Sequence, residues 1–330
     1  MNKFLIATLI ITTVHAQQPP KERLDSFFRT QHSQIAFCIL EGGRTLYANT
    51  TPADVNFRLA SVTKQFTAMA VLMLARQGRL KLDDSLRQWL PDIPPRIAVG
   101  VTLRHLLTHS SGLPDYEDLI PKEQTTQVLD ADVPRLLQHA DTPFFRPGTR
   151  FRYSNTGFCL LALVIEKASG RPYAEYLKTN VFQPLGMTNT TVYEAATPIA
   201  HRAMGHPVDQ SLTSATKGDG GIYTSVHDYA RWIEALQANE TYKAQLQALR
   251  FPISDDNYYA AGWFLAGADT WFHSGSTCGF NNFVIHRPKE DWTLVFLSNQ
   301  ADNEKAFQSV LDILGPSGFQ DVMALHALTR

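Results

Sequence analysis

A serine and a lysine stand three positions apart at the start of a long apolar segment, in Ser61-Val62-Thr63-Lys64. Because residues i and i+3 share one face of a helix, the Ser61 hydroxyl and the Lys64 amine can meet. A serine hydroxyl is a weak nucleophile that needs a base, and burial lowers the pKa of a lysine toward that role. The backbone N–H of Ser61 at the helix start is a candidate oxyanion donor. The pattern predicts nucleophilic catalysis by Ser61.

The same spacing occurs once more, in Ser214 and Lys217. Lys217 runs directly into Gly218-Asp219-Gly220-Gly221, a composition typical of a loop. Ser61, in contrast, opens a predicted helix that is apolar on several sides and closes at Gly78. We therefore interpret Ser214 as a chance match.

Two further patterns carry residues suited to the same chemistry. Tyr153 and Asn155 are two positions apart, so their side chains point the same way on an extended segment. A phenol can move protons when nearby cations favour its phenolate, and an amide can contact a substrate and an amine together. His273 and Gly275 lie in a strand-like segment, where glycine lets a substrate approach the backbone closely. The N–H of Ser276 is then the candidate second oxyanion donor.

The elements that must position these residues are strand-like at both ends of the chain and mainly helical between them. Strand patterns cover 34–40, 44–48, 260–265, 280–286 and 292–298, the first two forming a hairpin. Helices are predicted near 23–29, from 61 to 78, after Thr102 through 107, over 158–168, after Ser225 through 236, and over 304–314. This order predicts an α+β fold, with a sheet domain from 17–82 and 215–330 and a mainly helical domain inserted at 83–214.

The order of the motifs SxxK, YxN and HxG, at wide separations, resembles the penicillin-binding-protein and β-lactamase superfamily, and most of all its class C β-lactamase-related serine hydrolases. Other segments resemble the same group: Phe57-Arg58-Leu59-Ala60, Leu106-Leu107-Thr108-His109-Ser110-Ser111-Gly112-Leu113, Gly220-Gly221-Ile222-Tyr223-Thr224-Ser225 and Leu297-Ser298-Asn299. The resemblance covers most of the chain. It implies an antiparallel sheet of five or more strands flanked by helices, with the site between the sheet and the helical domain.

The resemblance also implies a role for each motif residue. Ser61 resembles the acylated nucleophile, Lys64 its activating partner, and Tyr153 the general base and the acid toward the leaving group. Asn155 resembles the substrate-positioning amide, and His273 and Gly275 the substrate-binding strand. His273 stands where many members have lysine, and a histidine near its ordinary pKa of about 6.5 is mostly neutral at pH 7. Recognition of a substrate carboxylate is weakened accordingly.

The group includes D-Ala-D-Ala carboxypeptidases, esterases and D-amino-acid peptidases. The resemblance therefore predicts a serine hydrolase that forms an acyl-enzyme on Ser61 with a peptide of the D-Ala type, an ester or a β-lactam. Such chemistry needs neither a metal nor an organic cofactor. The alternative is a non-catalytic, penicillin-binding-like protein that keeps the pocket without the chemistry. The chemically competent residues in all three motifs argue against that alternative.

A metal hydrolase is a further alternative. His105 and His109 are four positions apart and can share a metal if they lie on one helix. Leu106 stands where the HExxH pattern requires glutamate, so this pattern is incomplete. His109 is also part of a segment that the resemblance already explains.

Composition and the first residues bear on partners and location. The formal net charge of −1 gives no reason to expect nucleic acid as a partner, which leaves a small molecule or a peptide as the substrate. Residues 1–16 read as a signal peptide, with Lys3, an apolar run over 4–14 and a cleavage site after Ala16; an uncleaved anchor is the alternative. No later stretch is apolar enough for a membrane span. We expect a secreted or periplasmic protein.

The three cysteines do not form the even set typical of a disulfide framework. Cys38 and Cys159 lie in apolar runs, which predicts burial as small hydrophobic residues. Cys278 follows the His273 motif closely, and we interpret it as a structural thiol.

Overall fold

The computed structural model describes residues 19–327, except residues 50, 53, 268, 316–318, 320–321 and 324–325. The predicted signal peptide over 1–16 lies outside the described residues. The described chain begins with helix α1 (Lys21–Arg29), as the sequence predicts. None of the helices in these ranges is both long enough and apolar enough to cross a bilayer.

The main sheet has eight antiparallel strands in the order β2-β1-β11-β10-β9-β8-β7-β6. Its strands are β1 (Ile35–Glu41), β2 (Arg44–Ala48), β6 (Phe251–Ser254), β7 (Asn257–Ala260), β8 (Trp263–Ala266), β9 (Thr270–Thr277), β10 (Phe280–Arg287) and β11 (Trp292–Ser298). Strand β1 pairs with β11 from Ile35↔Ser298 to Glu41↔Trp292. The two ends of the chain therefore meet inside one sheet, and the predicted α+β fold with an antiparallel sheet is confirmed.

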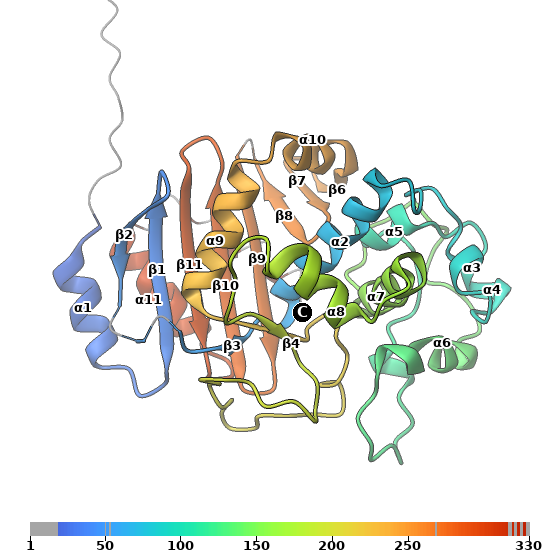
Figure 1. Ribbon diagram of the computed structural model, residues 1–330, viewed down its shortest axis with the longest axis horizontal. Coiled ribbons are helices and arrows are strands. Elements are labelled where there is room, and N and C mark those ends of the chain that lie inside the picture. The colour runs from blue at the N-terminus through green and yellow to red at the C-terminus, as the bar shows by residue number, and fades with distance from the viewer. Residues whose placement is uncertain are drawn as a thin grey trace, which may run out of the picture.

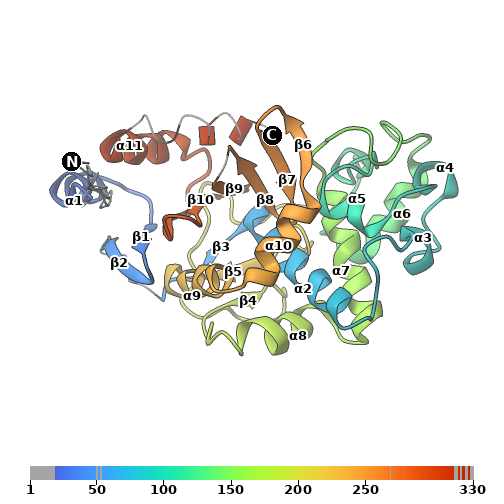
Figure 2. The same cartoon turned by 90° about the horizontal axis from the view of Figure 1, so that it is seen from above.

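Helices cover both faces of this sheet (Figures 1 and 2). Helices α1 and α11 (Glu304–Leu314) lie on one face, and α9 (Val226–Gln237) lies on the other. The central strands are buried on both sides for this reason, and their sequences are nearly continuous apolar runs. Phe307 of α11 stacks on Phe283 of β10 with ring centroids 3.9 Å apart.

The remaining helices lie partly over the α9 face of the sheet and partly beyond its β6 edge (Figures 1 and 2). They are α2 (Lys64–Arg76), α3 (Leu86–Trp89), α4 (Pro95–Ala98), α5 (Leu103–Leu107), α6 (Val133–Leu136), α7 (Asn155–Ser169), α8 (Tyr173–Leu177) and, beside β7, α10 (Glu240–Leu249). Predicted caps are confirmed: Thr102 accepts from the His105 N–H, and Gly170 ends α7 with φ 72°. Helices α2 and α7 pack on each other, which brings their first turns together.

A second, small sheet has the order β3-β5-β4, from β3 (Phe57–Arg58), β5 (Ile222–Thr224) and β4 (Thr191–Val192). It ties a strand from the predicted helical insertion to two strands from the predicted sheet domain. The boundaries at 82 and 214 remain a division based on the sequence.

Two local predictions are wrong in part. The segment from Ser61 does not begin as an α-helix: a 3₁₀ turn, η1 (Ala60–Thr63), precedes α2. The predicted strand over 260–265 is only partly right: 263–265 lie in β8, but a turn at Ala261 and Gly262, with φ of 46° and 88°, separates them from Ala260 at the end of β7. A side chain on Gly262 would lie 2.6 Å from the backbone nitrogen of Gln65, so the turn packs against the start of α2. The sequence does not predict this turn because the residues on both sides of Gly262 are apolar.

Candidate active site

Ser61 lies on a tight turn between β3 and α2. Ala60 before it has φ 49°, a left-handed conformation that is costly for a residue with a side chain, of order 1 kcal/mol. The turn η1 packs against β9 and β10. Ser61 itself is partly exposed, whereas its neighbours Val62 and Thr63 are buried. The fold thus presents one hydroxyl to solvent from an otherwise buried turn.

Lys64 is fully buried, and its ammonium contacts three oxygens. Nζ lies 2.9 Å from Ser61 Oγ, 2.8 Å from Asn155 Oδ1 and 3.0 Å from the backbone oxygen of Asp219. Three N–H groups meet three acceptors, so the charge is fully hydrogen-bonded. A neutral amine fits as well, since it donates to the two carbonyl oxygens and accepts from the Ser61 hydroxyl. A proton can therefore pass between Ser61 and Lys64 without rearrangement.

The pKa of Lys64 differs in direction from the sequence prediction. Burial acts to lower it, as expected, but electrostatic interactions with Tyr153 and Asp219 outweigh burial and raise the pKa above its ordinary value. The prediction of a lowered pKa considered only the helix that carries Lys64. Both opposing groups come from distant segments. The resting amine is a cation that stabilises negative charge on its neighbours.

Strand β9 runs along the turn η1 that carries Ser61. Strand β8 pairs only with β9 residues 270–272, so the edge that carries Gly275 and Ser276 is free to face η1. A side chain on Gly275 would lie 2.2 Å from the Leu59 oxygen and 3.1 Å from the Ser61 nitrogen. Gly275 therefore allows the turn itself, rather than a substrate, to approach the strand. The exposed Ser276 follows it, and its N–H remains the candidate second oxyanion donor.

Tyr153 stands between Lys64 and a group of aromatic rings. Lys64 Nζ lies 5.0 Å from the ring centroid of Tyr153. Its ring packs on His109, at 4.3 Å between centroids, and stacks on Phe264 of β8 at 6.3 Å. The Tyr153 hydroxyl is buried and, among the described residues, has no hydrogen-bond partner. It is thus available to a reacting group in the site.

His109 positions the segment that carries Tyr153. Its backbone oxygen accepts from the Arg152 N–H at 2.9 Å, and its Nδ1 accepts from the Ser154 N–H at 3.2 Å. His105 Nδ1 instead accepts from the Thr102 N–H at 3.1 Å, within the cap of α5. Both histidines thus bind backbone groups of different segments, and neither contact supports the two-histidine metal hypothesis.

Asn155 is the first residue of α7 and Ser154 before it is extended, so Tyr153 and Asn155 do not share one extended segment as the sequence predicts. Its backbone N–H donates to Asp115 Oδ2 at 2.7 Å, and its side-chain Nδ2 donates to Glu117 Oε1 at 3.1 Å. With Oδ1 on Lys64, the amide is bonded at both ends. Sequence reasoning missed the two acids. Their position just after Gly112-Leu113, a segment of the family resemblance, was the available signal.

His273 is completely buried on β9, and both ring nitrogens contact protein groups. Nδ1 donates to the Ser274 carbonyl, and Nε2 lies 3.4 Å from the Tyr259 hydroxyl. Since a carbonyl only accepts, Nδ1 carries the proton and Nε2 accepts from Tyr259. Burial and the nearby charge of Lys64 lower the pKa of His273 to about 3. The ring is therefore neutral at ordinary pH and supplies no cation for a substrate carboxylate.

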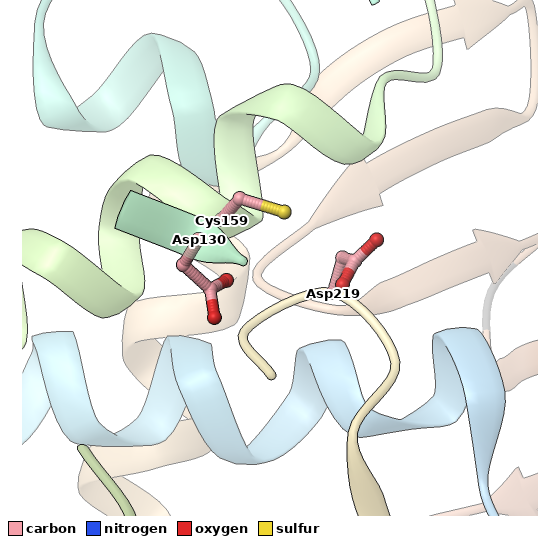
Figure 3. Close-up of side chains that lie close together, drawn as sticks. All are labelled: Asp130, Cys159 and Asp219. Atoms are coloured by element: carbon pink, nitrogen blue, oxygen red, sulfur yellow. The ribbon is translucent and has the colours of Figure 1, made fainter. Parts of the chain in front are cut away.

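A buried group of two acids and a thiol lies behind Lys64. One ligand atom each from Asp130, Cys159 and Asp219 falls within 4.8 Å of the others (Figure 3). The two oxygens of Asp130 already accept from the N–H groups of Lys217 and Gly218, at 2.8 and 3.1 Å. Burial raises the pKa of the Cys159 thiol well above its usual range, which disfavours the thiolate that a metal requires. We interpret the group as an anchor for the loop whose Asp219 oxygen meets the lysine.

The second SxxK does not assemble. Ser214 lies in a turn and its hydroxyl contacts Cys278 Sγ at 3.4 Å, while Lys217 pairs with Glu194 at 3.0 Å. The interpretation of Ser214 as a chance match is confirmed. Cys38 and Cys159 are buried as predicted, and Cys278 is a partly buried free thiol in the β9–β10 turn.

The sheet has eight antiparallel strands, and beside it a serine and a lysine three residues apart face a tyrosine and an asparagine. This arrangement is the one expected for the β-lactamase and penicillin-binding-protein superfamily. The Beta-lactamase family model matches residues 21–313, and the chain belongs to this family. A penicillin-binding protein of Bacillus subtilis strain 168 is 30% identical, over 89% of this chain and 75% of its own length. The crystal structure of a penicillin-binding protein from Bacillus halodurans is 30% identical with a TM-score of 0.73, covering 84% of this chain and 95% of that one.

A shorter similarity extends to protein flp of Staphylococcus aureus strain COL, which is 29% identical over 74% of this chain. The chain spans about half of that protein's length, 52%. The matched family and the two penicillin-binding proteins agree with the class that the sequence motifs predict.

Proposed function

We propose that the protein is a serine hydrolase that works through an acyl-enzyme on Ser61. The observation that carries this proposal is the position of Lys64 Nζ, within hydrogen-bond distance of Ser61 Oγ and of Asn155 Oδ1. The proposed nucleophile Ser61 and the substrate-positioning amide of Asn155 thereby contact the same buried amine, that of Lys64. This arrangement fits acyl transfer better than binding alone, because a binder has no use for an activated serine.

The reaction has two stages, acylation of Ser61 and hydrolysis of the acyl-enzyme. Ser61 Oγ attacks the substrate carbonyl carbon while its proton passes to the phenolate of Tyr153, which the Lys64 cation stabilises before the transfer. The N–H groups of Ser61 and Ser276 hold the oxyanion. The bond from the carbonyl carbon to the leaving nitrogen or oxygen then breaks, and Tyr153 returns the proton to that atom. Water attacks the acyl ester in the same way, which releases a carboxylic acid and restores the Ser61 hydroxyl.

The substrate carbonyl belongs to a peptide of the D-Ala type, an ester or a β-lactam. Similarity to two penicillin-binding proteins at 30% identity supports a pocket that accepts such carbonyls. We also propose that the substrate is a small molecule or a peptide, and that the protein acts after export, in the periplasm or outside the cell. The support for export is the signal-peptide pattern over residues 1–16.

Hydrolysis of the chromogenic ester p-nitrophenyl acetate tests the proposal. We expect turnover by the wild-type protein and by Ser214→Ala, which removes the serine of the unassembled SxxK. We expect Ser61→Ala to lose about 10²-fold or more of the rate, because no other activated nucleophile lies in the site. Equal rates for Ser61→Ala and the wild type would refute the assignment of Ser61.

A further inference from the structure

The side chain of Asp219 is an acid buried close to the amine of Lys64. The residue is only 6% exposed, and its backbone oxygen accepts from Lys64 Nζ at 3.0 Å. The Tyr116 hydroxyl donates to Oδ2 over a long 3.4 Å, and Oδ1 is buried without a hydrogen-bond partner among the described residues. A buried carboxylate with so few donors is costly unless an opposite charge lies near it. The ammonium of Lys64 supplies that charge.

The neighbouring acid, Asp130, is occupied in a different way. It lies in the same buried group (Figure 3), and its two oxygens accept from the N–H groups of Lys217 and Gly218. Burial and the charge of Asp219 raise the pKa of Asp130 to about 7, because two carboxylates in one buried group do not both ionise readily. Asp130 therefore anchors the loop, and Asp219 carries the charge that acts on Lys64.

The other groups around the amine leave Asp219 as its buried counter-charge. The titratable groups that face Lys64 are His109, Glu117, Tyr153, Cys159, Asp219 and His273. Both rings are neutral, since burial lowers the pKa of His109 well below its usual range and that of His273 to about 3. Burial raises the pKa of the thiol, which is neutral too. The tyrosine loses its charge once it takes the serine proton, and Glu117 is exposed, so solvent screens it.

We propose that Asp219 is a positioning residue that keeps Lys64 cationic while Ser61 is acylated. This inference rests on the proposed function and deepens it, because it decides which neighbour of Ser61 takes the proton. A lysine that stays protonated cannot accept a proton, so that role falls to Tyr153. Asp219 is buried behind the amine and acts through it rather than on the substrate.

Carbon-13 NMR of protein labelled at lysine Cε tests the charge of the amine without a need for activity. The Lys64 resonance is the one that Lys64→Met lacks, and its position follows the titration of the amine. Asp219→Asn removes the charge and keeps the backbone oxygen that Lys64 contacts. Asp130→Asn is the matched control, since it alters the acid of the same buried group that holds the loop. Acylation by p-nitrophenyl acetate is followed on the same proteins across neutral and alkaline pH.

We expect the Lys64 titration in Asp219→Asn to move to lower pH by about one pH unit or more, because the opposite charge is gone. Acylation should then be lost at correspondingly lower pH, since the cation that stabilises the phenolate disappears as the pH rises through the pKa of Lys64. Asp130→Asn should lower the free energy of unfolding in urea and move the titration by less than half as much.

An unchanged Lys64 titration in Asp219→Asn, or an equal shift in the two variants, would overturn the proposal. A Lys64 amine that is already neutral at neutral pH in the wild type would overturn it as well. Absence of Ser61 acylation in the wild type would instead remove the proposed function. The two failures are distinguishable, because the NMR titration reports the charge of Lys64 whether or not the ester reacts.

Discussion

Substitution of Gly275 by alanine tests the contact between strand β9 and η1, the turn that carries Ser61. The added Cβ would lie 2.2 Å from the Leu59 oxygen, 3.1 Å from Ser61 N and 3.2 Å from Val62 N. To restore an ordinary contact of 3.4 Å to the oxygen, the strand or the turn must move by about 1.2 Å. A shift of about 1 Å in a reacting group lowers rates by roughly 10²-fold, and overpacking costs about 1–3 kcal/mol of stability.

The assay is stopped-flow acylation by p-nitrophenyl acetate, with denaturant unfolding to confirm that the variant is folded. Gly220→Ala is the matched control, because its added Cβ would lie 3.7 Å from the nearest atoms of Ala60, an ordinary contact beside the same turn. We expect Gly275→Ala to acylate about 10²-fold more slowly and Gly220→Ala to resemble the wild type. Wild-type acylation by a folded Gly275→Ala protein would refute the close packing of β9 on the turn.

Two further predictions concern residues near Ser61. Asn282→Ala removes hydrogen bonds to the backbone oxygens of Arg58 and Gly275, at 2.9 and 3.3 Å. We therefore expect the free energy of unfolding in urea to fall by about 1–3 kcal/mol and kcat to be lower. A kcat equal to that of the wild type would contradict this positioning role. Tyr153→Phe removes a hydroxyl without a partner among the described residues, so we expect stability within about 0.5 kcal/mol of the wild type and acylation slower by about 10²–10⁴-fold.

Residues joined by short-range geometry were predictable from the sequence. The spacing of Ser61 and Lys64 makes their contact a property of one helical segment, and the structure places them 2.9 Å apart. Thr102 and Ser225 were predictable as caps because their side chains accept from an N–H three residues on. The helix over Glu304–Leu314 followed from its amphipathic pattern.

The long-range parts of the site were not predictable in this way. Lys64 contacts Asn155 and Asp219, which are 91 and 155 residues away along the chain. The raised pKa of Lys64 depends on Tyr153 and Asp219, which are distant along the chain, so reasoning from its own helix gave the wrong direction. The rings of Tyr259 and Phe264 reach Tyr153 from two strands whose connecting turn was predicted as a strand. The family resemblance supplied the order of the motifs but not these supporting residues.

The central claim is that Ser61 becomes acylated, and intact-mass spectrometry tests it most directly. Purified protein is mixed in parallel with benzylpenicillin and with p-nitrophenyl acetate, next to Ser61→Ala, and adducts are located by peptide mapping. We predict a mass increase by one acyl group on the peptide that contains Ser61 with at least one probe, and none in the variant. Acylation of Ser61→Ala at the wild-type level, or no acyl group on the Ser61 peptide with either probe, would contradict the account.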